Sequence, residues 1–167
     1  MSKSLIWLLS ALSCHAVLAS DLAIQLGVIA HPSENSALLR VENRTPILAE
    51  TLSTLDSQLS AYWQINANLW HTNETHFALR TGLGAQYQFS EHWALELGWG
   101  AIALDNRYIS SQHDMGSQLH FETTLGLRYQ LDPRSAIKLN VYHWSNANLA
   151  DVNPGCEVVF LGYQLRY

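Results

Sequence analysis

The sequence is short of cysteine and has no long apolar run after its first residues, and both shortages exclude classes of protein. Its two cysteines in 167 residues are Cys14 and Cys156. Because we expect Cys14 to be removed with a leader, Cys156 would remain alone and could form no intramolecular disulfide. We expect it to be a small buried or lipid-contacting residue. Beyond residue 19 no stretch of about 18 apolar residues occurs, so the sequence predicts no membrane-spanning helix.

Positive charge is also scarce. Nine Lys and Arg residues stand against 14 Asp and Glu residues, which gives a net charge of -5, and the charges are scattered. Since no basic run could neutralise phosphates, nucleic acid is not an expected partner. The mean hydropathy is close to zero. That value fits a soluble protein and a membrane β-barrel equally well, because barrel strands alternate apolar and polar residues.

The first 19 residues have the features of a secretory signal peptide. Lys3 supplies a short positive start, residues 5–12 are mostly apolar, and Val17-Leu18-Ala19 places short residues before a cleavage site. The apolar run is too short to cross a bilayer as a helix, and a buried N-terminal helix is the alternative interpretation. We predict a signal peptide over residues 1–19 and one domain over residues 20–167.

The remaining chain alternates apolar and polar residues with period two, which is the pattern of β-strands. The clearest case is the C-terminus, where Val159, Leu161, Tyr163, Leu165 and Tyr167 alternate with small or polar residues. An ending on an aromatic strand resembles the C-terminal signature of bacterial outer-membrane proteins. Similar alternation predicts further strands around residues 22–28, 37–41, 59–69, 77–89, 93–101, 119–131 and 137–141, of which the region 35–54 is least clear. Turn signals at Ser90-Glu91, Asp132-Pro133 and Asn153-Pro154-Gly155 separate several of them.

Two architectures fit this alternation. A soluble sandwich or lipocalin-like barrel turns its apolar side inward, whereas a membrane barrel turns it outward. We favour an all-β fold, an eight-stranded antiparallel transmembrane β-barrel of the bacterial outer membrane, because aromatic residues gather on the apolar side and closure leaves no unpaired strand edge in hydrocarbon. Glycines and charges occupy the opposite side. We expect Arg80, Glu96, Glu122 and Arg128 to form an interior polar network.

Three polar residues interrupt the apolar side of the last two strands. His143 and Ser145 follow Val141 on the same side of one strand, and Glu157 precedes Val159 on the next. Polar groups facing lipid are costly unless they serve a function. The hairpin has its middle near residue 151, so His143 and Glu157 should be cross-strand neighbours. The pattern indicates a serine nucleophile, a histidine base and an orienting acid; a solvated hairpin end in the polar interface remains the alternative.

The same residues resemble a known family. The run His143-Trp144-Ser145-Asn146-Ala147, followed by Asn153-Pro154-Gly155 and Glu157, resembles the active-site hairpin of the PagL-type lipid A 3-O-deacylases. The stretch 116–122 resembles that family's sixth strand. The resemblance covers the mature chain and is specific in the C-terminal third. It implies an outer-membrane ester hydrolase that removes the 3-position acyl chain from lipid A of lipopolysaccharide, with His143, Ser145 and Glu157 as the triad.

The resemblance also implies supporting residues. Asn146 would contribute to the oxyanion hole and Asn153 would support the site. Asn148 stands where the family often has a glycine whose backbone N–H helps to bind the oxyanion, and asparagine tolerates unusual backbone angles better than most residues.

The sequence indicates no cofactor and no metal site, because the remaining histidines lack metal-ligand spacing and no acidic cluster suggests calcium. We expect those histidines to be solvated loop or lumen residues: His31, His71, His76, His92, His113 and His120. The expected partners are lipid A or lipopolysaccharide as substrate and the surrounding outer-membrane lipid, and a homodimer is left open. Rival functions are a non-catalytic structural or adhesive barrel, a soluble periplasmic lipid binder and an acyltransferase of the same membrane.

Overall fold

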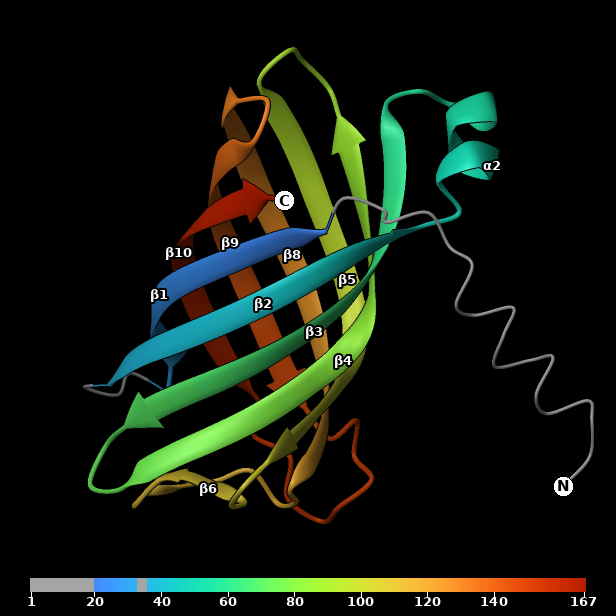
Figure 1. The fold of residues 1–167 in the computed structure, drawn as a ribbon. Helices are drawn as coiled ribbons and strands as arrows, with labels where there is room; N and C mark the ends of the chain where they lie inside the picture. Colours follow the sequence, from blue (N-terminus) through green and yellow to red (C-terminus); the bar gives the residue numbers. More distant parts are fainter. Residues whose placement is uncertain (1–19, 33–35) are drawn as a thin grey trace, which may run out of the picture.

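Eight strands close into an antiparallel barrel in the order β1-β10-β9-β8-β5-β4-β3-β2 (Figure 1). The computed structural model describes residues 20–32 and 36–167, so the predicted signal peptide lies outside the described residues. The barrel strands are β1 (Asp21–His31), β2 (Ala37–Ile47), β3 (Leu59–His71), β4 (Thr75–Gln88), β5 (Trp93–Leu104), β8 (Leu119–Asp132), β9 (Ser135–Ser145) and β10 (Cys156–Arg166). The predicted eight-stranded barrel is confirmed.

The first and last strands close the barrel by pairing with each other. Ser20 and Tyr167 exchange two backbone hydrogen bonds of 3.2 and 3.0 Å next to that pairing. We call this end of the barrel the terminal end. The opposite end, which we call the loop end, carries residues 105–118 and 146–155 (Figure 1). The catalytic candidates lie at the loop end, because β9 ends there and β10 begins there.

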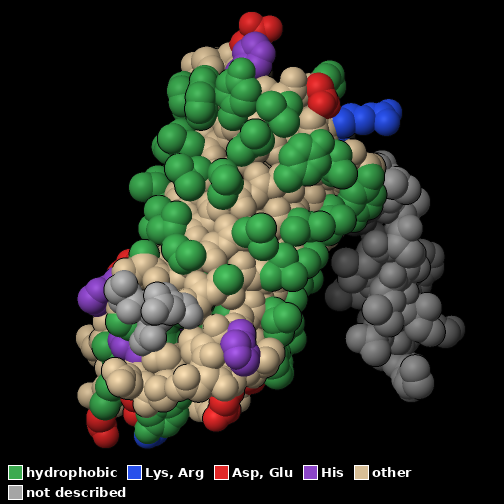
Figure 2. All heavy atoms as spheres, turned by 90° about the vertical axis from the view of Figure 1, so that its left-hand side faces the viewer, with side chains coloured by type: hydrophobic (Ala, Val, Ile, Leu, Met, Phe, Trp, Pro, Cys, Tyr) green, Lys and Arg blue, Asp and Glu red, His purple; other side chains and the backbone are tan. Residues whose placement is uncertain are grey.

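The outer wall is apolar. On the face drawn in Figure 2, hydrophobic side chains cover the middle of the barrel, and the exposed charged side chains lie toward its two ends. Leu26 on β1, Trp99 on β5 and Leu161 on β10 are 67, 57 and 61% exposed, whereas Gln25 next to Leu26 and Phe160 next to Leu161 are completely buried. Such exposure would destabilise a soluble protein, and it is the arrangement of a transmembrane barrel. Among the described residues, no helix is long and apolar enough to cross a membrane.

The lumen is filled by a network of buried charges. Glu122 accepts hydrogen bonds from Arg40, with a shortest distance of 2.5 Å, and its other oxygen lies 3.0 Å from Arg80 Nε. A second group in the network pairs carboxylates with cations from other strands: Glu42 with Lys138 at 2.6 Å, and Glu96 with Arg44 at 2.6 and 2.8 Å. The predicted interior network is therefore confirmed for Arg80, Glu96 and Glu122, and it includes further residues that the sequence did not indicate. Arg128 is buried in the lumen as predicted, but its Nε has no hydrogen-bond partner among the described residues. Paired and hydrogen-bonded, these charges can stay buried, and they link strands on different sides of the barrel.

Three features of the fold were not predicted. The polar connection after β2 contains a short helix, α2 (Ala49–Leu55), and the segment before β8 forms a two-stranded sheet, β6 (Tyr108–Ser110) with β7 (His113–Asp114). The lumen at the loop end is apolar rather than polar: a buried cluster contains Trp70, Ile109, Met115, Tyr142, Trp144 and Phe160. Trp70 Nε1 donates a hydrogen bond of 3.0 Å to the carbonyl of Ile109. The β6–β7 segment and the residue after it therefore pack into the barrel at the loop end through the buried side chains of Ile109 and Met115.

Candidate active site

His143 and Glu157 form a pair on the outer wall. They are directly opposed in the register of β9 and β10, as predicted. His143 Nδ1 lies 2.8 Å from Glu157 Oε1, a hydrogen bond of short, charge-assisted length. The two side chains are 45 and 38% exposed, so each is accessible from outside the barrel. The carboxylate therefore fixes the ring orientation and leaves Nε2 as the nitrogen that can take a proton.

Ser145 lies two residues further along β9 on the same outward side. Residues two apart on a strand are about 7 Å apart at the backbone, a distance that an imidazole leaning along the strand can bridge. Within the described chain neither the Ser145 hydroxyl nor His143 Nε2 makes a hydrogen bond. Hydrogen bonds of a catalytic site are often long in the free enzyme and shorten when substrate binds. The three predicted residues thus share one patch, and the His143–Glu157 contact is already formed.

Gly155 packs closely against the His143 ring. Its φ is +72°, a left-handed conformation that glycine adopts without steric cost. A Cβ at this position would lie 3.0 Å from His143 Cε1 and 3.8 Å from Nε2. Gly155 therefore serves two needs, the backbone turn into β10 and the space for the imidazole. The turn signal Asn153-Pro154-Gly155 indicated the first need, and only the structure revealed the second.

A tight turn follows Ser145. The N–H of Leu149 donates to the carbonyl of Asn146 at 3.0 Å, and Ala147 and Asn148 have φ values of 54° and 61°. Two left-handed residues in the middle of a β-turn define type I′. An alanine in that conformation is strained, and strained backbone gathers at functional sites. The turn re-aims the chain immediately after the candidate nucleophile.

Asn146 holds the loop together rather than facing the site. Its Nδ2 donates to the carbonyls of Val152 at 2.7 Å and Met115 at 3.1 Å, and the side chain is fully buried. Its backbone N–H donates to Asn153 Oδ1 at 2.9 Å, and Asn153 Nδ2 donates to Asn148 Oδ1 at 3.0 Å. All N–H groups of Asn146 are therefore occupied, which does not favour the expected direct contact with an oxyanion.

Free donors remain one and two residues further on. The backbone N–H groups of Ala147 and Asn148 make no hydrogen bond within residues 20–32 and 36–167. Asn148 adopts the positive φ that the expected glycine would provide. Asparagine thus substitutes for glycine here without preventing the turn.

The β6–β7 segment braces the same loop from the other side. His113 Nε2 lies 2.9 Å from the carbonyl oxygen of Gly155, and Met115 accepts the hydrogen bond from Asn146. Gly116 has φ +80°, and a Cβ there would collide with the carbonyl of Val152. These contacts join segments 30 or more residues apart, so the sequence carried no signal for them beyond the family resemblance of 116–122.

Between the two outward residues of β9, Trp144 points into the lumen. It is completely buried, and its Nε1–H donates to Glu122 Oε2 at 2.7 Å. Cys156 lies opposite Trp144 in the register and is also buried. This agrees with the first of the two alternatives expected for it, a buried or a lipid-contacting residue. The strand that carries His143 and Ser145 is thereby anchored to the lumen charge network.

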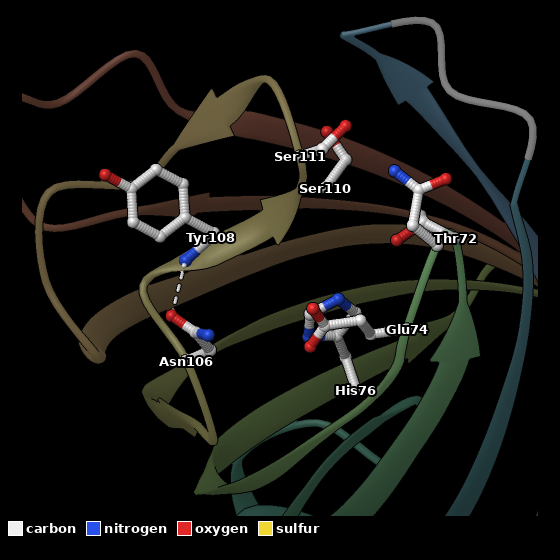
Figure 3. Close-up of a pocket in the computed structure, with 8 residues that line it drawn as sticks. Thr72, Glu74, His76, Asn106, Tyr108, Ser110 and Ser111 are labelled. Carbon is white, nitrogen blue, oxygen red and sulfur yellow. Dashed lines mark hydrogen bonds between the residues drawn. The ribbon is translucent and has the colours of Figure 1, made fainter.

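A separate hollow of about 240 Å³ lies at the loop end, away from this patch (Figure 3). Its lining residues are of polar or amphipathic types and come from the β3–β4 turn, the start of β4 and the β6 region: Thr72, Asn73, Glu74, His76, Asn106, Tyr108, Ser110 and Ser111. His76 is buried there, stacked on Trp70 with ring centroids 5.3 Å apart. In the described part of the chain no three His, Cys, Asp or Glu side chains are grouped as metal ligands would be.

Comparison with known proteins gives the family and the fold of the chain. The family model described as lipid A 3-O-deacylase (PagL) matches residues 38–166, which include all or most of every barrel strand except β1. The chain belongs to the PagL family. Its barrel matches a crystal structure of "the outer membrane enzyme PagL" with a TM-score of 0.72 at 21% identity, covering 87% of this chain and 98% of that one.

Two further comparisons concern one sequence relative and one structure with the same fold. A curated "Lipid A deacylase PagL" from Bordetella bronchiseptica is 31% identical over 77 residues, which cover 46% of this chain and 43% of that relative's length. The N-terminal β-barrel domain of Pseudomonas aeruginosa OprF matches with a TM-score of 0.61 at 12% identity, over 90% of this chain and 98% of that one, and this similarity concerns the fold alone.

Proposed function

We propose that the chain is an outer-membrane esterase that removes the 3-position acyl chain from lipid A, with Ser145, His143 and Glu157 as its catalytic triad. The observation that supports it most is the 2.8 Å His143–Glu157 contact on the lipid-facing wall, beside an outward serine. Family membership adds the reaction and the substrate class.

In the proposed reaction Ser145 Oγ attacks the carbonyl carbon of the ester while His143 Nε2 takes its proton. The tetrahedral intermediate then expels the sugar 3-oxygen, which receives that proton from His143. Water, deprotonated by His143, attacks the acyl-serine, and the fatty acid leaves as Ser145 is regenerated. Glu157 keeps the ring in one tautomer and stabilises the imidazolium that forms in each half.

The oxyanion of both intermediates needs hydrogen-bond donors near Ser145. We assign this role to the free backbone N–H groups of Ala147 and Asn148, which the type I′ turn presents. Asn146 and Asn153 support them by fixing the loop. Removing one donor from such a hole typically lowers the rate by about 10²–10³.

The location of the site supports a membrane lipid as substrate. Both ends of the described chain lie at the terminal end. Because outer-membrane barrels have short periplasmic turns and longer extracellular loops, we place the terminal end in the periplasm and the loop end at the outer leaflet. Lipopolysaccharide occupies that leaflet, so its acyl esters could reach an exterior site without leaving the bilayer.

Mass spectrometry of lipid A from cells expressing the chain tests the proposal. We expect one acyl chain fewer with the wild type and no loss with Ser145→Ala. Ser57→Ala, which changes an exposed serine in the turn before β3, is the matched control and should behave as wild type. An unchanged acyl pattern with the wild type would refute the proposed activity and leave a non-catalytic barrel. Equal deacylation by the wild type and Ser145→Ala would refute Ser145 as the nucleophile.

A further inference from the structure

The His143–Glu157 pair is part of a longer row of polar side chains. On the outer wall, the register places Thr123 of β8 opposite His143, and His31 of β1 opposite Glu157 on its other side. Four neighbouring strands therefore carry a polar residue at one level. One step toward the middle of the barrel, the outward residues of the same strands are apolar: Leu125, Val141, Val159 and Val28. A second histidine thus flanks the carboxylate that orients His143.

His31 reaches the outer wall because β1 contains a bulge. Along β1 the even-numbered residues Leu22 to Val28 face outward, and the odd-numbered Ala23, Gln25 and Ile29 face the lumen. Continued alternation would point His31 into the lumen. The register with β10 shifts between Ile29 and His31, which places His31 across from Glu157 with its side chain exposed. Bulges beside active sites commonly re-aim a side chain in this way.

Glu157 has room for a second donor. Its Oε1 accepts from His143 Nδ1, and within the described residues its other oxygen has no hydrogen bond. Directly opposed residues of antiparallel strands have Cα atoms about 4.5–5.5 Å apart. His143 contacts the carboxylate from that separation on β9, so His31 has the same reach from β1. A partly exposed carboxylate held on one side only can rotate away from its histidine.

We propose that His31 is a positioning residue for the reaction, donating an imidazole N–H to the second oxygen of Glu157 when substrate covers the patch. This inference rests on the proposed function. Glu157 would then be held between two histidines, with His31 as a hydrogen-bond donor on one side and His143 as the base on the other. The sequence suggested only a solvated or lumen histidine at position 31, because period-two alternation does not reveal a bulge.

The test compares His31→Ala and His31→Gln, each alone and combined with Glu157→Ala, using purified protein and both lipid A and a p-nitrophenyl ester of a long-chain acid. Because one hydrogen bond to a charged group is lost, we expect His31→Ala to lower kcat about tenfold with little change in KM. The His31→Gln variant should keep most of kcat, since an amide N–H can replace the imidazole donor. In the Glu157→Ala background, His31→Ala should cause no further loss.

His71→Ala is the matched control, because His71 is an exposed histidine at the same end whose Nδ1 lies 3.2 Å from Thr75 Oγ1, on strands away from the row. Unchanged kcat in His31→Ala would overturn the inference. A rise in KM with no change in kcat would also overturn it, because His31 would then act on substrate. The same would follow if His31→Ala lowered kcat equally in the wild-type and Glu157→Ala backgrounds. Ester hydrolysis by a wild type that leaves lipid A intact would refute the proposed substrate, while the His31 comparison on the ester would still decide this inference.

Discussion

Replacing Gly155 by alanine tests the geometry of the His143 ring without touching any polar group. The added Cβ would lie 3.0 Å from His143 Cε1, closer than ordinary van der Waals contact, and 3.8 Å from Nε2. Since Gly155 has φ +72°, the substitution also forces alanine into the left-handed region. Two separable effects follow, one on stability and one on the ring.

The stability effect comes from the backbone. A left-handed conformation costs a residue with a Cβ about 1–2 kcal/mol, so the free energy of unfolding should fall by that amount. The effect on the ring is a small displacement of the imidazole that is expected to lower the deacylation rate. The imidazole must move by a few tenths of an ångström, and a displacement of about 1 Å at an active site can cost about 10²-fold. We therefore expect deacylation to slow about threefold to tenfold while the barrel still folds.

The assay pairs urea unfolding in lipid vesicles with the deacylation rate of the same preparation. Gly98→Ala is the matched control, because a Cβ there would lie 3.3 Å from the Thr124 side chain in the lumen wall, far from β10 in the barrel order. It should lose little stability and no activity. If Gly155→Ala loses the expected stability but keeps the full deacylation rate, the position of the His143 ring does not depend on the absence of a side chain at Gly155, and the reasoning fails.

Two further predictions follow from the supports around the site. Trp144→Phe removes the indole donor to Glu122 but leaves Arg40 and Arg80 paired with that carboxylate, so urea unfolding should show a loss of about 1–2 kcal/mol; no change would mean that the buried bond adds no stability. Asn146→Ala frees the loop from its two carbonyl partners, so the deacylation rate should fall well over tenfold although circular dichroism still reports a barrel; a rate near wild type would show that the turn holds its shape unaided.

The sequence was sufficient to predict most of the fold because apolar and polar residues alternate with period two along each barrel strand, and this pattern is visible in the sequence itself. Each of the eight strands lies where period-two alternation placed it, and β2 was recovered even though the region 35–54 was unclear. The parity of His143, Ser145 and Glu157 also placed them outward, and hairpin symmetry predicted the His143–Glu157 pairing. These are local relations, fixed by the two-residue period of a strand and by one turn.

Non-local relations needed the tertiary structure. Only barrel closure brings β1 beside β10, and only a bulge turns His31 outward, so its place next to Glu157 could not be read from periodicity. The loop contacts of Asn146 to Met115 and of His113 to Gly155 join segments distant in sequence. Where the strands are regular, the sequence by itself thus determined which residues face the lipid, since the side chains of a strand alternate between its two sides. The packing of loops over the barrel mouth decided how those residues are held, because hydrogen-bond partners there depend on three-dimensional proximity alone.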